Sequence, residues 1–110
     1  MPSETFSVLT LLFNARKRLN NVFAGMIPGD EGFEEIEQAI ADIDERRDTL
    51  TRILVKENTK RFVSANHELV KVNDKMKEAL AELASMQKKI EAITALVKAA
   101  DNFIAAVVPG

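Results

Sequence analysis

Residues 55–71 read VKENTKRFVSANHELVK, and this stretch decides whether the chain forms one long helical rod or a helical hairpin. On its amino-terminal side, apolar residues recur at alternating spacings of three and four, which is the heptad pattern of a helix that packs against another helix. The same alternation resumes on its carboxyl-terminal side, but its phase is offset by one residue. The apolar face of the chain therefore changes register inside the quoted stretch.

The two apolar stripes form the expected interaction seam of the protein. One charged residue, Arg47, interrupts the first stripe, and its aliphatic stem can lie along apolar surface while its head contacts an acid or water. A charge at such a position often fixes the register or the choice of partner. The first stripe includes Ile36, Ile40, Ile43, Arg47, Leu50 and Leu54, and the second includes Leu69, Val72, Met76, Leu83, Met86, Ile90, Ile93, Val97 and Ile104.

Two structures can account for the offset between the stripes. In the first, a turn ends one helix and Ser64 or Asn66 caps the next, so that two helices form a hairpin. In the second, the helix is continuous with a one-residue skip, because a strict heptad pattern drifts by about 20° per repeat on a straight helix. The hairpin is favoured, because a rod over residues 33–108 would measure roughly 114 Å at 1.5 Å per residue and could not bury either stripe within one chain.

Composition and helix breakers define the rest of the expected fold. The chain of 110 residues suits a single domain, and it is rich in the helix-forming residues Ala, Glu, Lys and Leu. Gly25, Pro28, Gly29 and Gly32 lie close together and predict a connector. We therefore predict an all-α antiparallel helical bundle, or coiled-coil hairpin, of one shorter and two long helices that is completed by dimerisation. The predicted single domain covers residues 1–110, with helices near 5–24, 31–60 and 66–108 and a connector at 25–30.

Charge is distributed unevenly, although the net charge is only −2. Residues 30–45 contain eight acids and no base, whereas residues 46–61 contain six bases and two acids. Acids at a helix start and bases at its end complement the helix dipole, but both runs extend beyond the terminal turns where that effect acts. We therefore expect antiparallel self-pairing, which places an acidic half beside a basic half. The residues expected to take part are Glu34, Glu35, Glu37, Arg46, Arg52 and Lys56.

The sequence predicts no catalytic residue, no metal site and no cofactor. There is no cysteine, and the single histidine, His67, begins the first half of a zinc-protease motif whose second histidine position is Lys71. Ser64 precedes His67 by about one helical turn, but nothing in the sequence builds an oxyanion hole for a Ser–His pair. The stretch GMIPGDEG lacks the lysine and the glycine spacing of a phosphate-binding loop. We therefore expect a non-enzymatic protein.

Nucleic acid and membranes are disfavoured as partners. The sequence pI is about 5.4, and no aromatic residue is interleaved with the bases at 15–18 and 46–61. The carboxyl-terminal segment is apolar on more than one face through Leu96 and Phe103, but an interfacial helix usually carries several bases on its polar face. The uncharged run at 5–15 has eleven residues, fewer than the roughly 20 that cross a bilayer, and we expect a cytoplasmic protein.

These observations favour a helical interaction or scaffold module. It would act through coiled-coil-like self-association or by binding a helix of a partner. The expected partners are a second copy of the chain, with a dimer favoured, or another helical protein. The alternative function is that of a membrane-active helical protein, such as a pore-forming or holin-like component, which would use the apolar carboxyl-terminal segment.

Overall fold

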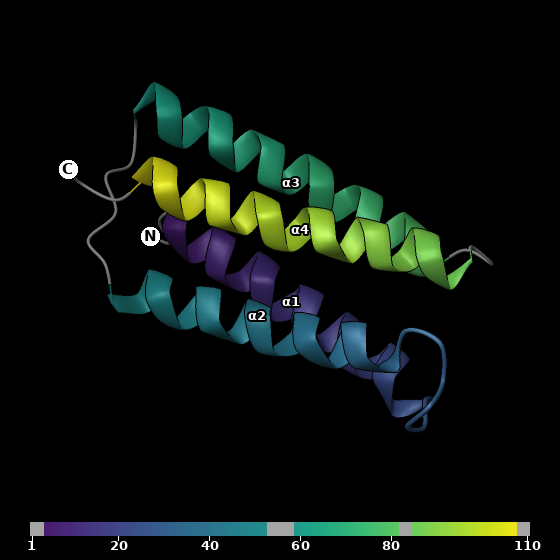
Figure 1. Ribbon diagram of the computed structural model, residues 1–110. Coiled ribbons are helices and arrows are strands. Elements are labelled where there is room, and N and C mark those ends of the chain that lie inside the picture. The colour runs from purple at the N-terminus through teal and green to yellow at the C-terminus, as the bar shows by residue number, and fades with distance from the viewer. Residues whose placement is uncertain (1–3, 53–58, 82–84, 108–110) are drawn as a thin grey trace.

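The computed structural model describes residues 4–52, 59–81 and 85–107, and these form an all-helical structure (Figure 1). The prediction of an all-α fold is confirmed, since the described residues contain helices and turns but no strand. The four helices are α1 (Glu4–Ala24), α2 (Phe33–Arg52), α3 (Lys60–Ala81) and α4 (Met86–Val107).

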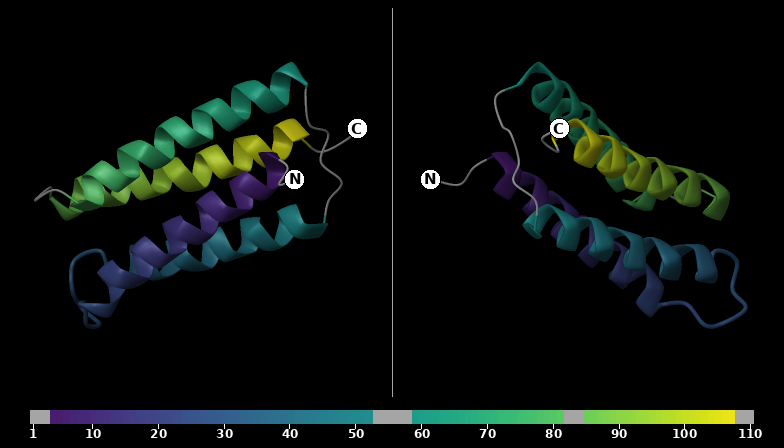
Figure 2. Two further views of the ribbon diagram at one scale, coloured as in Figure 1. Left: turned by 180° about the vertical axis from the view of Figure 1, so that it is seen from behind. Right: turned by 60° about the vertical axis from the view of Figure 1, so that its left-hand side comes forward.

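The helices form two antiparallel hairpins that are stacked on each other (Figures 1 and 2). The first hairpin pairs α1 with α2, and the second pairs α3 with α4. Across the stack, α1 packs against α3 and α2 packs against α4, and each of these two pairs runs in the same direction. The resulting bundle measures 43 × 25 × 23 Å.

The prediction of one shorter and two long helices is not confirmed. The described helices are nearly equal, at 21, 20, 22 and 22 residues. Where one helix was expected over residues 66–108, the structure has α3 and α4 side by side. The backbone N–H of Lys88 donates to the side-chain oxygen of Ser85 at 3.3 Å, so Ser85 caps the start of α4. The apolar stripe keeps one phase across both helices, so the pattern did not reveal this boundary.

The described part of the stretch at 55–71, residues 59–71, forms the beginning of α3. Helix α2 ends at Arg52 and α3 begins at Lys60. The backbone N–H of Phe62 donates to the hydroxyl oxygen of Thr59 at 3.0 Å, so Thr59 caps α3. The expectation that Ser64 or Asn66 caps this helix was wrong, because both lie inside α3. Among the described residues, α2 packs on α1 and α4 rather than on α3.

The hydrophobic core lies between the two hairpins, and every helix contributes to it. The rings of Phe62 and Phe103 meet edge to face with their centroids 5.3 Å apart. Each fully buried Leu, Ile or Phe side chain contributes about 1.5–3 kcal/mol to stability through the hydrophobic effect. The buried apolar residues are Val8, Leu12, Ala15, Leu19, Ile36, Ala39, Ile43, Leu50, Phe62, Leu69, Met76, Ile93, Leu96, Ala99, Ala100, Phe103 and Val107.

The connector before α2 contacts the start of α4 through a glycine. Gly32 has a φ of 85°, a backbone conformation that residues with a Cβ rarely adopt. A Cβ at Gly32 would lie 2.6 Å from the Sδ of Met86 and 3.3 Å from the Cδ1 of Ile90. The missing side chain therefore allows the connector to touch α4 and places the start of α2 beside the start of α4.

A candidate binding groove between helices α2 and α4

A groove of about 460 Å³ lies between α2 and α4. One side chain, Ile93, is only 3% exposed and lies in the core, while Ile90 and Val97 are half-buried along the groove. Apolar side chains of α4 therefore form the floor, and polar side chains of α2 form the facing wall. The lining residues are Glu34, Glu35, Gln38, Ala39, Asp42, Ile90, Ile93, Thr94 and Val97.

The helical repeat explains why these residues line one groove. On α2, Glu35, Gln38 and Asp42 follow spacings of three and four, so they form one ridge beside the buried stripe. On α4, Ile90, Ile93 and Val97 follow the same spacings. Helices α2 and α4 run in the same direction (Figure 1), and residues of both rows line the groove.

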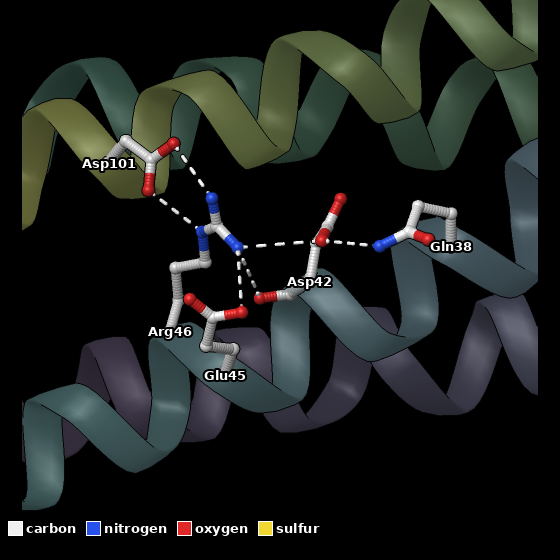
Figure 3. A network of polar contacts seen from close by, with 5 residues as sticks. All are labelled: Gln38, Asp42, Glu45, Arg46 and Asp101. Atoms are coloured by element: carbon white, nitrogen blue, oxygen red, sulfur yellow. Dashed lines mark hydrogen bonds and ion pairs between the residues drawn. The ribbon is translucent and has the colours of Figure 1, made fainter.

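Contacts between the two sides bound the groove at both ends. At one end, Gly32 abuts Met86, as described above. At the other end, the Arg46 guanidinium binds Asp101 with two hydrogen bonds, from Nε to Oδ1 at 2.7 Å and from Nη2 to Oδ2 at 3.1 Å (Figure 3). Paired hydrogen bonds of this kind are among the stronger polar contacts in proteins. They join the first hairpin to the second.

Arg46 is the centre of a wider polar network (Figure 3). Its Nη1 donates to the backbone oxygen of Asp42 at 3.2 Å and lies 3.8 Å from the carboxylate of Glu45. The amide of Gln38 donates to the Asp42 carboxylate at 2.9 Å. The hydrogen bond with Asp101 raises the pKa of Arg46 above its ordinary value, and burial opposes this rise. The Arg46 side chain is only 19% exposed, so the network is largely shielded from water on the arginine side.

The carboxylates of the groove that lack an ion-pair partner among the described residues lie at the end near Gly32. Glu34 and Glu35 are exposed, and neither forms an ion pair with another described residue. Asp42, by contrast, shares the Arg46 guanidinium at 3.6 Å. The groove therefore combines an apolar floor with two unneutralised carboxylates near the start of α2.

Most of the expected interaction seam lies inside the chain. Only Ile90, Ile93 and Val97 of the seam line the groove. Leu54 and Leu83 lie outside the described residues. The seam residues in the core are Ile36, Ile43, Leu50, Leu69, Met76 and Ile93, and those packed against the core at partial exposure are Ile40, Val72, Met86, Val97 and Ile104.

The charge in the seam, Arg47, points toward α1. Its guanidinium carbon lies 5.0 Å from the centre of the Phe13 ring, and its Nη1 lies 3.8 Å from Asp44. Asp44 also pairs with Arg16 of α1 at 2.6 Å. The bond between hairpins is made by the preceding residue, Arg46, which the seam pattern did not single out. A signal was present in Asp101, the only acid in residues 92–110.

The residues expected to pair charges in an assembly have different surroundings. Glu37 is exposed, as Glu34 and Glu35 are. Arg46 is engaged within the chain, and Arg52 is exposed and forms an ion pair with Asp48 one turn earlier. Lys56 lies outside the described residues. Antiparallel self-pairing through this set stays a prediction, with one of its bases already neutralised by Asp101.

The remaining chemical features are few. No group of three or more His, Cys, Asp or Glu residues is placed to hold a metal ion in the described ranges. His67 is exposed on α3, where it adjoins Lys60, Val63, Ser64 and Glu68 in a shallow hollow. Within the same ranges, no helix combines the length and the apolar character that crossing a bilayer requires.

Comparison of the chain with protein-family models, curated protein sequences and solved structures found no match.

Proposed function

We propose that this protein is a non-enzymatic helical interaction module that binds a basic amphipathic helix of a partner protein in the α2–α4 groove. The observation that carries the proposal is the combination of an apolar floor, at Ile90 and Val97, with the free carboxylates of Glu34 and Glu35. Such a surface has an apolar side and a negative side. Its ligand needs the matching apolar and positive sides.

The length of the groove suits a short helix. The contacts that bound it, at Gly32 and at Arg46, are fourteen residues apart along the chain. At 1.5 Å per residue this corresponds to about 20 Å, or roughly four helical turns. Helices that bind in grooves use apolar anchors at positions i, i+3 or i+4, and i+7, which lie on one face. Such a row of anchors would lie along the floor of α4.

Charge supports the choice of a basic ligand. Lys or Arg residues beside the anchors would lie near Glu34 and Glu35, whose charges no other described residue neutralises. Complementary charges at the edge of an interface speed association and exclude partners of the wrong sign. An acidic helix of the same apolar pattern would be repelled.

The proposal is tested with a synthetic, fluorescently labelled peptide of Leu and Lys that has leucines at i, i+3, i+4 and i+7. Two further peptides serve as comparisons, one with Glu in place of Lys and one with the same composition in scrambled order. We expect the amphipathic basic peptide to bind about tenfold more tightly than either comparison, since it alone matches both the floor and the wall. Fluorescence anisotropy measures the three dissociation constants.

Variants of the chain separate the groove from general attraction between opposite charges. Glu34→Lys/Glu35→Lys should weaken binding of the basic peptide by about tenfold, because it replaces attraction with repulsion at the wall. The matched control is Glu68→Lys/Glu78→Lys on the exposed side of α3, which makes the same change in net charge and should leave the affinity nearly unchanged. Equal weakening by the control, or equal binding of all three peptides, would contradict the proposal.

A further inference from the structure

Helix α3 carries a second line of residues on the side away from the core. Its buried face is formed by Phe62, Leu69 and Met76. The outward line has alternating spacings of three and four, and all of its members are exposed. It consists of Lys60, Val63, His67, Val70 and Asp74.

This outward line contains two large apolar side chains in contact with water. Val63 is 57% exposed and Val70 is 42% exposed. The pair lies two helical turns apart on a helix whose opposite face is already buried. Helix α3 is therefore apolar on two faces, although the fold uses only one of them.

The positions of the charged and apolar residues in the outward line are nearly symmetrical about His67. Lys60 and Asp74, which carry opposite charges, lie seven residues before and seven residues after His67. The two valines lie four residues before and three residues after His67. A two-fold symmetric contact requires that if residue i touches residue j of the other copy, residue j touches residue i. The line satisfies this requirement with favourable contacts on both sides.

We propose that a second copy of this chain packs its α3 against this α3 in an antiparallel, two-fold symmetric contact centred near His67. Each Val63 then faces Val70 of the other copy, and each Lys60 lies near Asp74 of the other copy. A parallel contact would instead place like charges together, Lys60 beside Lys60 and Asp74 beside Asp74. Opposite charges across paired helices set orientation in this way.

The contact goes beyond the proposed function, because it uses a different face of the bundle. Helix α3 lies diagonally opposite α2 and does not line the α2–α4 groove (Figures 1 and 2). A dimer formed through α3 would keep both grooves open. Two grooves on one particle would bind a partner with two basic helices more tightly than either groove alone.

A charge-exchange experiment tests the orientation. Lys60→Glu and Asp74→Lys should each raise the dissociation constant of the dimer by about tenfold, because each change replaces two symmetric attractions with repulsions. The double variant Lys60→Glu/Asp74→Lys should return to nearly the original affinity, because the exchanged charges again face opposite charges. Sedimentation velocity over a concentration series at low salt measures the constants, and Lys98→Glu on α4 is the matched control.

Disulfide trapping provides a second measurement that does not depend on charge. The chain has no cysteine, so one introduced thiol can react only with the same thiol of another copy. His67→Cys lies near the proposed axis and should form a covalent dimer rapidly under copper-catalysed air oxidation. Lys98→Cys, exposed on α4, should cross-link slowly, because its two thiols are far apart in the proposed dimer.

Several outcomes would overturn the contact. These are a wild-type chain that stays monomeric over the concentration series, a double charge exchange that fails to restore affinity, and equal cross-linking at positions 67 and 98. The groove is tested independently. Val70→Glu should abolish the dimer while each chain still binds the basic peptide, and Glu34→Lys/Glu35→Lys should weaken peptide binding while the dimer persists. Circular dichroism confirms that each variant retains its helices.

Discussion

Gly32 connects the local backbone with the packing of distant helices. Its φ is positive, as is that of Gly29, where φ is 99°. Only Gly32, however, lies against another helix, since a Cβ at Gly29 would have no neighbouring atom within 4 Å. Comparing the two positions therefore distinguishes the cost of backbone strain from the cost of a steric clash when a methyl group is added. Both would strain the backbone, and only one would also clash with Met86.

We expect Gly32→Ala to destabilise the protein more than Gly29→Ala. A left-handed conformation costs a residue with a Cβ about 1–2 kcal/mol, which applies to both variants. Crowding of Met86 should add about 1 kcal/mol at position 32, at the lower end of the cost of overpacking because the methionine side chain can move. Urea unfolding followed by circular dichroism measures both variants. Equal destabilisation would mean that the contact with α4 does not constrain the connector.

At the scale of the helices, one hydroxyl group caps the amino-terminal end of α3 and another caps that of α4. The side-chain oxygens of Thr59 and Ser85 each accept a backbone N–H from the residue three positions later. A long run of residues with high helix propensity has few intrinsic stops, so a cap has a large influence on where a helix begins. The correction from Ser64 to Thr59 as the cap of α3 follows from this geometry.

Thr59→Ala should lower the free energy of unfolding by about 1 kcal/mol, because one backbone N–H at the start of α3 loses its acceptor. Ser64→Ala provides the control, since Ser64 is exposed in the second turn of α3. Alanine has the higher helix propensity, so this control should be neutral or slightly stabilising. If Ser64→Ala had the larger effect, α3 would begin later than Lys60. Urea denaturation provides both values.

Packing of α4 bears on the membrane-active alternative. Leu96 and Phe103 are the apolar residues that a membrane-binding carboxyl-terminal segment was expected to use, and both are buried in the core. Insertion of α4 would therefore require the two hairpins to separate first. The loss of buried apolar surface opposes that separation, because each of these side chains contributes about 1.5–3 kcal/mol when buried.

At the scale of the whole molecule, the bond between Arg46 and Asp101 joins the two hairpins. Asp101→Asn should lower the free energy of unfolding by about 1 kcal/mol. This value lies between that of an exposed ion pair and that of a buried charged hydrogen bond, because the Asp101 side chain is 50% exposed. The raised pKa of Arg46 contributes stability at neutral pH, far below the ordinary pKa of arginine, and this contribution is lost as the pH rises into strong alkali.

The matched control for this bond is Asp48→Asn, which removes an exposed ion pair with Arg52 inside α2. We expect this control to change the free energy of unfolding by less than about 0.5 kcal/mol, as is usual for exposed pairs within one helix. Chemical denaturation of both variants in the same buffer makes the comparison. Equal effects would show that the contact between hairpins adds no more than a surface ion pair.

Several features of the molecule follow from the periodicity of its residues. The spacing of seven residues, or two helical turns, between Ile36, Ile43 and Leu50 indicates a helix with one apolar face, and these side chains are buried in the core. The glycines at 25, 29 and 32 indicate an interruption, and the chain turns there between α1 and α2. Periodicity reveals such local features because a side chain's direction on a helix depends only on its position along that helix.

The partners of each apolar face were decided by the tertiary structure. The stripe from Leu69 to Ile104 has one phase, yet it belongs to two helices that face the same core. The groove depends on residues 34–42 lying beside residues 90–97, and Arg46 rather than Arg47 reaches α4 because Asp101 lies opposite it. The sequence by itself therefore determined the helical class and the apolar faces, whereas only the three-dimensional packing decided which faces cover one another. The physical reason is that the hydrophobic effect rewards burial of apolar area without specifying the surface that covers it.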